Sequence, residues 1–264
     1  MWDRCVIISE RELKTFLSGE IGDPHAVLGM RPMAQCGAVV VRAFLPEVER
    51  VELFDPASTR TFPLSRIDES GFFECEIPKR KKVFPYLLRS FGQGGEEEFH
   101  DPYSFLPTTS NEDLVAFNQG EERRPHEKLG AIAREFLGVS GVSFVLWAPY
   151  ARQVFLIGDF NDWNEVSLPM RPLGPSGCWE LFVPFASCGQ KYKFLIHGVD
   201  GKQVTKADPF AAFCEPPPEN ASLIHDFSGL PSAIICPPFT PPSGPMSIIQ
   251  SAVFITSKLC SITT

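Results

Sequence analysis

The chain has 264 residues, 44% of them hydrophobic and 21% charged, with a formal net charge of −8. This composition is typical of a globular protein that buries a core, and the acidic balance argues against nucleic acid or an anionic membrane as a partner, because both require a basic face. The sequence contains no run of about 18 apolar residues, so it predicts no transmembrane helix. The first residues carry too many charges for a signal peptide. We therefore expect a cytoplasmic protein.

Eight cysteines are spread along the chain without a C-x-x-C pair and without a histidine at ligand spacing. In a cytoplasmic protein this pattern predicts reduced cysteines rather than disulfides or a zinc site. The motifs G-x-S-x-G, H-E-x-x-H and G-x-x-x-x-G-K are also absent from the sequence. We expect neither a metal nor a cofactor.

The first predicted element is a short helix within residues 9–19. Apolar side chains recur there at helical spacing, and Ser9 followed three residues later by Glu12 has the pattern of a capping box. Residues 39–45 are typical of a strand. After a polar corner, residues 51–54 are typical of a second strand that ends in a turn.

The most informative stretch is FVLWAPYARQVFLIGDFNDWN, residues 144–164. Apolar residues alternate on both sides of Pro149, which predicts two short strands joined at a corner. A cluster of Asn, Asp and Gly follows and predicts a loop that carries Trp163 outward. An indole on a polar loop favours a flat apolar ligand surface, so this loop is the first candidate for a ligand contact.

This stretch is the second copy of a repeated unit. Landmarks of the first copy recur in the second at a slowly growing offset: Pro46 and Pro149 (103), Tyr86 and Tyr192 (106), Asp101 and Asp208 (107). Several landmarks that keep their order and nearly their spacing predict a duplicated domain.

Each copy consists of short strands separated by turn residues, at intervals of roughly 8–12 residues, with almost no helical periodicity. We predict an all-β fold of two tandem immunoglobulin-like β-sandwiches with short helical segments and an irregular C-terminal tail. The modules are expected at residues 1–110 and 137–226, joined by a linker with a helical segment at residues 111–136. Residues 227–264 form a proline-rich apolar tail.

The motifs that mark both copies resemble a known family. They are DPHAVLG (residues 23–29), HDPY (100–103), the central stretch (144–164), WELFVP (179–184) and KADPF (206–210). At these motifs the chain resembles the N-terminal half of bacterial 1,4-α-glucan (glycogen) branching enzymes. The second copy resembles the starch- and glycogen-binding module that precedes α-amylase-type barrels.

The resemblance covers about residues 10–226 and implies a role in glycogen biosynthesis. Enzymes of this family cleave an α-1,4 bond and transfer the chain to a 6-hydroxyl in a catalytic barrel. Such a barrel needs about 250 residues. Residues 244–248 resemble the family's lead-in to the first barrel strand, but from Ile249 onward the resemblance stops. We interpret residues 227–264 as the truncated or frameshifted start of the missing barrel, and we expect this chain to bind α-glucan without catalysing the transfer.

Three acidic residues near the central loop, Asp159, Asp162 and Glu165, are the candidates for catalysis within the second copy. A glycosidase needs two carboxylates on opposite sides of the scissile bond. Acids on one exposed loop do not meet this condition, and turn chemistry explains Asp at such positions. We therefore predict no catalytic residue.

Candidate glucan-binding residues follow from the resemblance. Trp163, Lys193 and Asn220 match positions that contact glucan in related binding modules. The alternative for Trp163 is a loop anchor packed on its own sheet. The hairpin at residues 200–204 lacks the second stacking aromatic of those modules, so we expect weak binding. The other two indoles of this copy, in apolar alternation, are expected in the sandwich core: Trp147 and Trp179.

The expected partner is an α-glucan such as glycogen, amylose or an amylopectin-like chain, bound by a monomer. The alternative is a free-standing glycogen-targeting or regulatory subunit that binds another protein.

Overall fold

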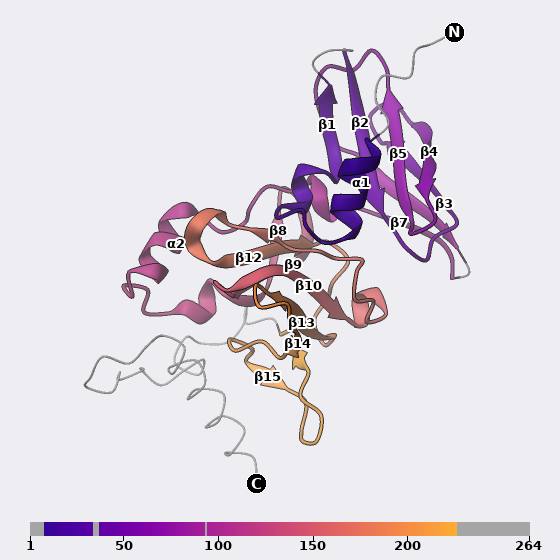
Figure 1. Cartoon of the computed structure of the whole chain (residues 1–264). Helices are drawn as coiled ribbons and strands as arrows, with labels where there is room; N and C mark the ends of the chain where they lie inside the picture. Colours follow the sequence, from indigo (N-terminus) through magenta and orange to yellow (C-terminus); the bar gives the residue numbers. More distant parts are fainter. Residues whose placement is uncertain (1–7, 34–36, 93, 226–264) are drawn as a thin grey trace, which may run out of the picture.

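The computed structural model describes residues 8–33, 37–92 and 94–225. The chain forms two β modules that lie side by side, with short helices at the start of each and between strands (Figure 1). The prediction of an all-β fold with short helical segments is confirmed. The predicted irregular tail, residues 227–264, lies outside the described residues. None of the helices in the described ranges is long and apolar enough to cross a membrane.

The first module is built from one helix, two 3₁₀ turns and a sheet that folds into a sandwich. Its elements are α1 (Glu10–Leu17), η1 (Pro24–Ala26), β1 (Gly29–Met33), β2 (Ala38–Phe44), β3 (Arg50–Asp55), β4 (Arg60–Asp68), β5 (Phe72–Ile77), β6 (Leu87–Gly92), β7 (Gly95–Phe99) and η2 (Pro102–Ser104). The strand order is β1-β2-β5-β4-β3-β6-β7. The long strand β4 pairs with β3 at one end and with β5 at the other, so it passes between the two layers.

The second module has two separate antiparallel sheets. Its elements are α2 (Asn111–Asn118), η3 (Pro125–Glu127), β8 (Gly130–Phe136), β9 (Val139–Trp147), β10 (Ala151–Gly158), η4 (Asp159–Asn161), β11 (Arg171–Pro172), η5 (Gly174–Ser176), β12 (Cys178–Val183), β13 (Lys191–Gly198), β14 (Gln203–Lys206), β15 (Phe213–Cys214) and β16 (Ser222–Leu223). One sheet has the order β11-β12-β9-β8. The other has the order β10-β13-β16-β15, with β14 also paired to β13.

The predicted linker contains more structure than a helical segment. Residues 111–136 hold α2, η3 and β8, and β8 pairs with β9 along its whole length. Residues 130–136 are therefore part of the second module's sheet. Their composition, with Ala, Gly and charged residues, gave only weak alternation.

The two copies also repeat elements that the sequence comparison did not use. Each begins with a Ser-capped helix, and a P-H-x-x-L-G segment follows: residues 24–29 in the first copy and 125–130 in the second. Each segment makes a 3₁₀ turn and ends in a glycine with positive φ, +83° at Gly29 and +96° at Gly130. Such a conformation favours glycine.

A buried tyrosine–aspartate pair closes each copy. The Tyr86 hydroxyl donates to Asp101 and the Tyr192 hydroxyl donates to Asp208, both at 2.5 Å. Each aspartate also accepts a backbone N–H from the residue two positions further on. Burial raises the pKa of both carboxyl groups to about 6, although the tyrosine hydrogen bond acts in the opposite direction. The predicted duplication therefore extends to buried polar contacts.

One hydrophobic cluster spans both modules, and the first module has a second cluster of its own between its layers. Phe16 of α1 packs edge-on against Phe44 and Phe72 of the first module, and the same core cluster continues into β9, β10, β12 and β13. At the junction the Tyr103 hydroxyl donates to the carbonyl of Pro169 at 3.3 Å. In Figure 1, α1 lies between the two modules.

Strand alternation divides the indoles of the second module. Trp179 points into the core and donates its indole N–H to the carbonyl of Ala148 at 3.1 Å. Trp147 lies on the opposite face of the sheet, where it contacts Phe117 of α2 at a ring distance of 6.0 Å. The expectation that both indoles lie in the sandwich was therefore wrong for Trp147. Helix α2 covers its face, so both faces of β9 are apolar.

Candidate functional site

The candidate site lies on the outer face of the β10-β13-β16-β15 sheet. Residues directly opposite each other in paired strands share a face, and the core takes the side chains of Tyr192 and Phe194 from β13. The residues between them in β13 therefore point outward. Cross-strand register assigns the following residues to this outer face: Phe155 and Ile157 of β10, Lys191, Lys193 and Leu195 of β13, Leu223 of β16 and Phe213 of β15.

Trp163 lies over this face. It is partly buried and packs against a small cluster of Phe155, Ile157 and Leu195. Its indole Nε1 donates to Oδ1 of Asp159 at 3.0 Å. The position therefore combines both sequence-based interpretations: the indole is anchored on its own sheet, and part of its surface remains exposed to solvent.

The loop that carries Trp163 has a strained backbone and is held by several hydrogen bonds. Both Asp162 and Trp163 have positive φ, +51° and +58°, a conformation that is rare for bulky residues and costs about 1–3 kcal/mol where it occurs. The Asn161 amide compensates by bonding four groups of the loop: Gly158 N, Leu156 O, Asn164 O and Ser167 Oγ. The loop thus holds the indole in one orientation.

Asp159 links this loop to β13. While Oδ1 accepts the indole N–H, Oδ2 accepts the backbone N–H of Lys191 at 2.8 Å. Its carboxylate therefore orients Trp163 rather than facing a cleft. Asp162 and Glu165 are exposed on the same loop, and no geometry brings the three acids to opposite sides of a substrate. That the chain lacks catalytic residues stays a prediction.

The other two predicted residues lie near the same end of β13. Lys193 is partly buried beside Ile157 of β10 and forms no ion pair within the described part of the chain. Asn220 is exposed in the turn between β15 and β16. Because β16 pairs with β13 at Lys191 and Tyr192, this turn emerges close to the Asp159 contact. Trp163 and Lys193 thus lie over the same pair of strands, with Asn220 in the turn before the neighbouring strand β16, and their role in binding remains a prediction.

The sequence analysis missed several residues of this face. Lys191 Nζ forms an ion pair with Glu215 Oε1 at 2.6 Å. The ion pair lowers the pKa of Glu215 and raises the pKa of Lys191. Phe213 is 49% exposed. No periodicity marks these residues, because β15 and β16 are two residues long and their register depends on the whole sheet.

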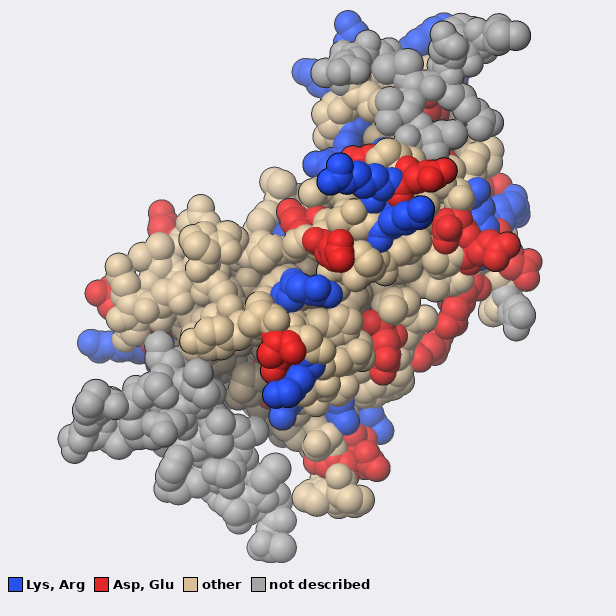
Figure 2. Space-filling model, in the orientation of Figure 1, with Lys and Arg blue, Asp and Glu red and all other residues tan. Residues whose placement is uncertain are grey.

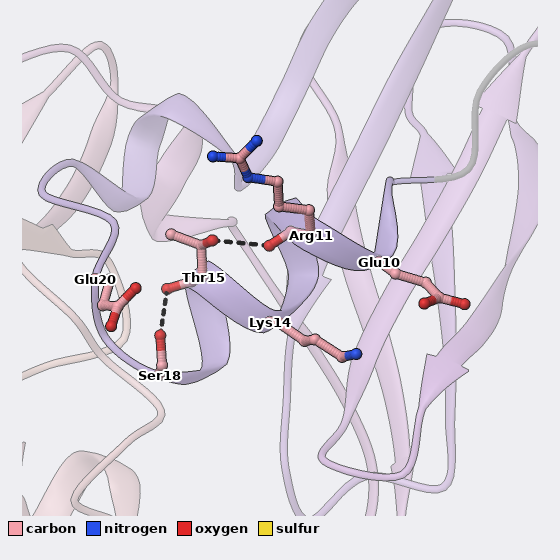
Figure 3. A pocket seen from close by; sticks show the side chains of 6 residues that line it. All are labelled: Glu10, Arg11, Lys14, Thr15, Ser18 and Glu20. Carbon is pink, nitrogen blue, oxygen red and sulfur yellow. Dashed lines mark hydrogen bonds between the residues drawn. The ribbon is translucent and has the colours of Figure 1, made fainter.

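Two hollows lie away from this face. One, of about 470 Å³, follows the exposed side of α1 (Figure 3). Two of its lining hydroxyls donate to helix carbonyls, Thr15 to Arg11 and Ser18 to Thr15, and its other side chains are charged, so it offers no flat apolar surface. The second, of about 460 Å³, is lined by Trp147 and several prolines beside α2.

The surface electrostatics agree with the acidic composition. In the view of Figure 2, acidic and basic side chains are interspersed over the described surface rather than gathered into a basic stripe. Among the described residues, no group of three or more His, Cys, Asp or Glu side chains is arranged to hold a metal ion.

The fold defines this chain as two tandem β-sandwich modules, the second with a tryptophan held over an outer sheet face. Comparison with known proteins identifies both modules. Residues 9–103 match the N-terminal domain of the alpha-1,4-glucan branching enzyme GlgB, and residues 128–211 match carbohydrate-binding module 48, the isoamylase N-terminal domain. Over both modules the chain is therefore homologous to the N-terminal region of 1,4-α-glucan branching enzymes, as the resemblance implied.

A curated relative supports this identification. The 1,4-alpha-glucan branching enzyme GlgB of Thermosynechococcus vestitus is 37% identical over 224 residues, which are 84% of this chain and 29% of that protein. The chain thus spans less than a third of the relative's length. These matches give no support to the alternative of a free-standing regulatory subunit.

Solved structures of pullulanases are more distant. The pullulanase of Anoxybacillus sp. LM18-11 with maltotriose has a TM-score of 0.34 and 14% identity, covering 83% of this chain and 30% of that chain. The maltotriose complex of the PulA-G680L mutant from Klebsiella pneumoniae has a TM-score of 0.35 and 15% identity, covering 78% and 25%. At these TM-scores neither bears on the site.

Proposed function

We propose that the second module binds α-glucan chains such as glycogen, amylose or amylopectin-like chains through Trp163, Lys193 and Asn220. The chain acts as a monomer in the cytoplasm and positions glucan without cleaving it. The family's reaction, transfer of an α-1,4 chain to a 6-hydroxyl, is assigned to the longer protein of which this region is typical. The observation that carries the proposal is the fixed, partly exposed indole over an outer sheet face.

The chemistry of the face suits a pyranose ring. Sugars present flat C–H faces that stack on an indole, and their hydroxyls need a few fixed polar groups. The N–H of Trp163 is already taken by Asp159, so the indole contributes stacking rather than a hydrogen bond. The ammonium group of Lys193 and the amide of Asn220 supply hydrogen bonds at the edge. One indole and two polar groups imply affinity of about millimolar strength, near −4 kcal/mol.

The test is a pair of substitutions, Trp163→Ala and Trp163→Phe, measured by retention in native gels that contain glycogen or amylopectin. Trp163→Ala should abolish retention, and Trp163→Phe should keep part of it because a ring remains for stacking. The indole is only partly buried, so its removal should cost less than the about 3–5 kcal/mol of a fully buried aromatic. Thermal unfolding of each variant checks this cost.

The matched control is Tyr150→Ala. Tyr150 is an aromatic residue that is 71% exposed at the corner before β10, away from Trp163, so its removal should leave retention unchanged. Full retention of a folded Trp163→Ala variant would contradict the proposal. So would retention that follows only the folded fraction of each variant.

A further inference from the structure

The proposed site leaves one aromatic residue of the same face unexplained. Phe213 of β15 is 49% exposed. Register places it opposite Leu223 of β16, which is opposite Lys191 of β13. Phe213 therefore points to the same side of the sheet as Trp163. Its ring lies 4.5 Å from the ring of His225, which holds it against the end of β16.

A fixed polar pair stands between the two aromatic residues. Lys191 is held at both ends, because its backbone N–H donates to Asp159 and its ammonium pairs with Glu215 at 2.6 Å. Glu215 is held in turn, since its second oxygen accepts the backbone N–H of Ala221 at 3.2 Å. Donor and acceptor groups that are already oriented lose little entropy when they bind sugar hydroxyls.

The edge strand β14 offers no alternative platform. Its residues on the outer face, Gln203 opposite His197 and Thr205 opposite Leu195, are polar and exposed. Val204 lies opposite Ile196 and so belongs to the other side of the strand. The aromatic residue that the hairpin at residues 200–204 lacks is therefore supplied on this face by β15.

We propose that Phe213 is a second stacking platform, and that one α-glucan chain crosses β13 and β16 from Trp163 to Phe213. The Lys191–Glu215 pair binds hydroxyls of the sugar units between the two rings. The inference rests on the proposed function, because it extends the same site. Two strand spacings separate β13 from β15, about 10 Å, so only a chain of several glucose units reaches both platforms. The site thus selects for glucan length.

The test compares a long and a short ligand on the wild type and on variants of the two aromatic residues. Calorimetric titration with maltoheptaose and with maltose is carried out on the wild type, Phe213→Ala and Trp163→Ala. Phe213→Ala should weaken maltoheptaose binding by about threefold to tenfold, the range of one aromatic contact, and leave maltose binding unchanged. Trp163→Ala should weaken both ligands. Phe213→Trp should strengthen maltoheptaose binding, because it enlarges the platform.

The outcomes separate the two proposals. If Phe213→Ala binds maltoheptaose like the wild type while Trp163→Ala does not, the second platform is refuted and the proposed function stands. If neither substitution changes binding, the proposed function fails. Equal weakening of maltose and maltoheptaose by Phe213→Ala, or a lower melting temperature without any change in binding, would show a structural role and also overturn the inference. Tyr150→Ala again serves as the exposed aromatic control.

Discussion

The two modules have similar strands and turns, but they differ in one loop, which follows β3 in the first module and β10 in the second. After β3, Asp55 caps Ala57 and Ser58 and pairs with Arg80, so a tight turn closes on itself. After β10, a longer loop carries Trp163 over the sheet. The residue after the tyrosine that both copies share also differs: Leu87 follows Tyr86, whereas Lys193 follows Tyr192. The candidate site therefore depends on loop and surface residues added to a duplicated frame.

A second difference concerns a buried glutamate that both modules share. Glu74 of β5 and Glu180 of β12 each accept a backbone N–H from just before the capped helix, from Ile8 and Thr108. The first glutamate pairs with Arg42 of the adjacent strand β2, whereas the second pairs with Arg171 of β11. In both modules an arginine thus pairs with this glutamate, but the arginine comes from a different strand in each.

The largest predicted effect tests this shared contact. Glu180 is fully buried and its partner arginine side chain is 7% exposed, whereas Glu74 and its partner are 7% and 11% exposed. Glu180→Ala leaves an unpaired buried guanidinium and should lower the free energy of unfolding by about 3–5 kcal/mol. Glu74→Ala should cost less, because its arginine is closer to water. Urea denaturation measures both.

Glu180→Gln is the matched control, since it keeps an acceptor for the two Thr108 donors while removing the charge. It should be more stable than Glu180→Ala. A Glu74→Ala variant that is less stable than Glu180→Ala would contradict the ranking by burial.

The second prediction uses the pH dependence of the repeated Tyr–Asp pair. Burial raises the pKa of Asp101 and Asp208 to about 6, above the value of about 3.9 in an unfolded chain. Between about pH 4 and 6 the folded state keeps protons that the unfolded state has released, so each group's contribution to stability is present below this window and falls as pH rises through it.

Asp101→Asn and Asp208→Asn remove one such titration each. Relative to the wild type, each variant should therefore gain stability from pH 4 to pH 7, by up to about 3 kcal/mol. Denaturation at several pH values measures the difference. If only one of the two variants changes the pH dependence of the free energy of unfolding, the two Tyr–Asp pairs are not equivalent. The two copies would then share the geometry of this pair but not its titration.

The sequence predicted what depends on local pattern. The capped helix at Ser9 and the loop of Trp163 follow from residues close to one another in the chain, and the duplication follows from short local motifs that recur at a nearly constant offset. It failed where partners are distant. The position of β8 in its sheet depends on pairing with β9. Trp147 lies on a sheet face that only the folded position of α2 covers, and the outward direction of Phe213 depends on register across three strands.

The smallest predicted effect compares the two helix caps. At α1 the cap is reciprocal, because Ser9 Oγ accepts the Glu12 N–H at 3.2 Å and the Glu12 carboxylate accepts the Ser9 N–H at 3.2 Å. At α2 Ser110 Oγ accepts the Asp113 N–H at 3.1 Å, and Asp113 bonds the hydroxyl of Ser110. Removal of a Ser cap typically costs about 0.5–2 kcal/mol.

Ser9→Ala should fall in the upper part of that range and Ser110→Ala in the lower part, because only the first change breaks a reciprocal cap. Helix α1 also carries Phe16 into the core that both modules share, so fraying at its first turn loosens the junction, whereas α2 covers only one face of the second module. Ser9→Thr retains an accepting hydroxyl and should lie close to the wild type in urea denaturation. A larger loss for Ser110→Ala than for Ser9→Ala would mean that the two helices do not play the same part in the repeated frame.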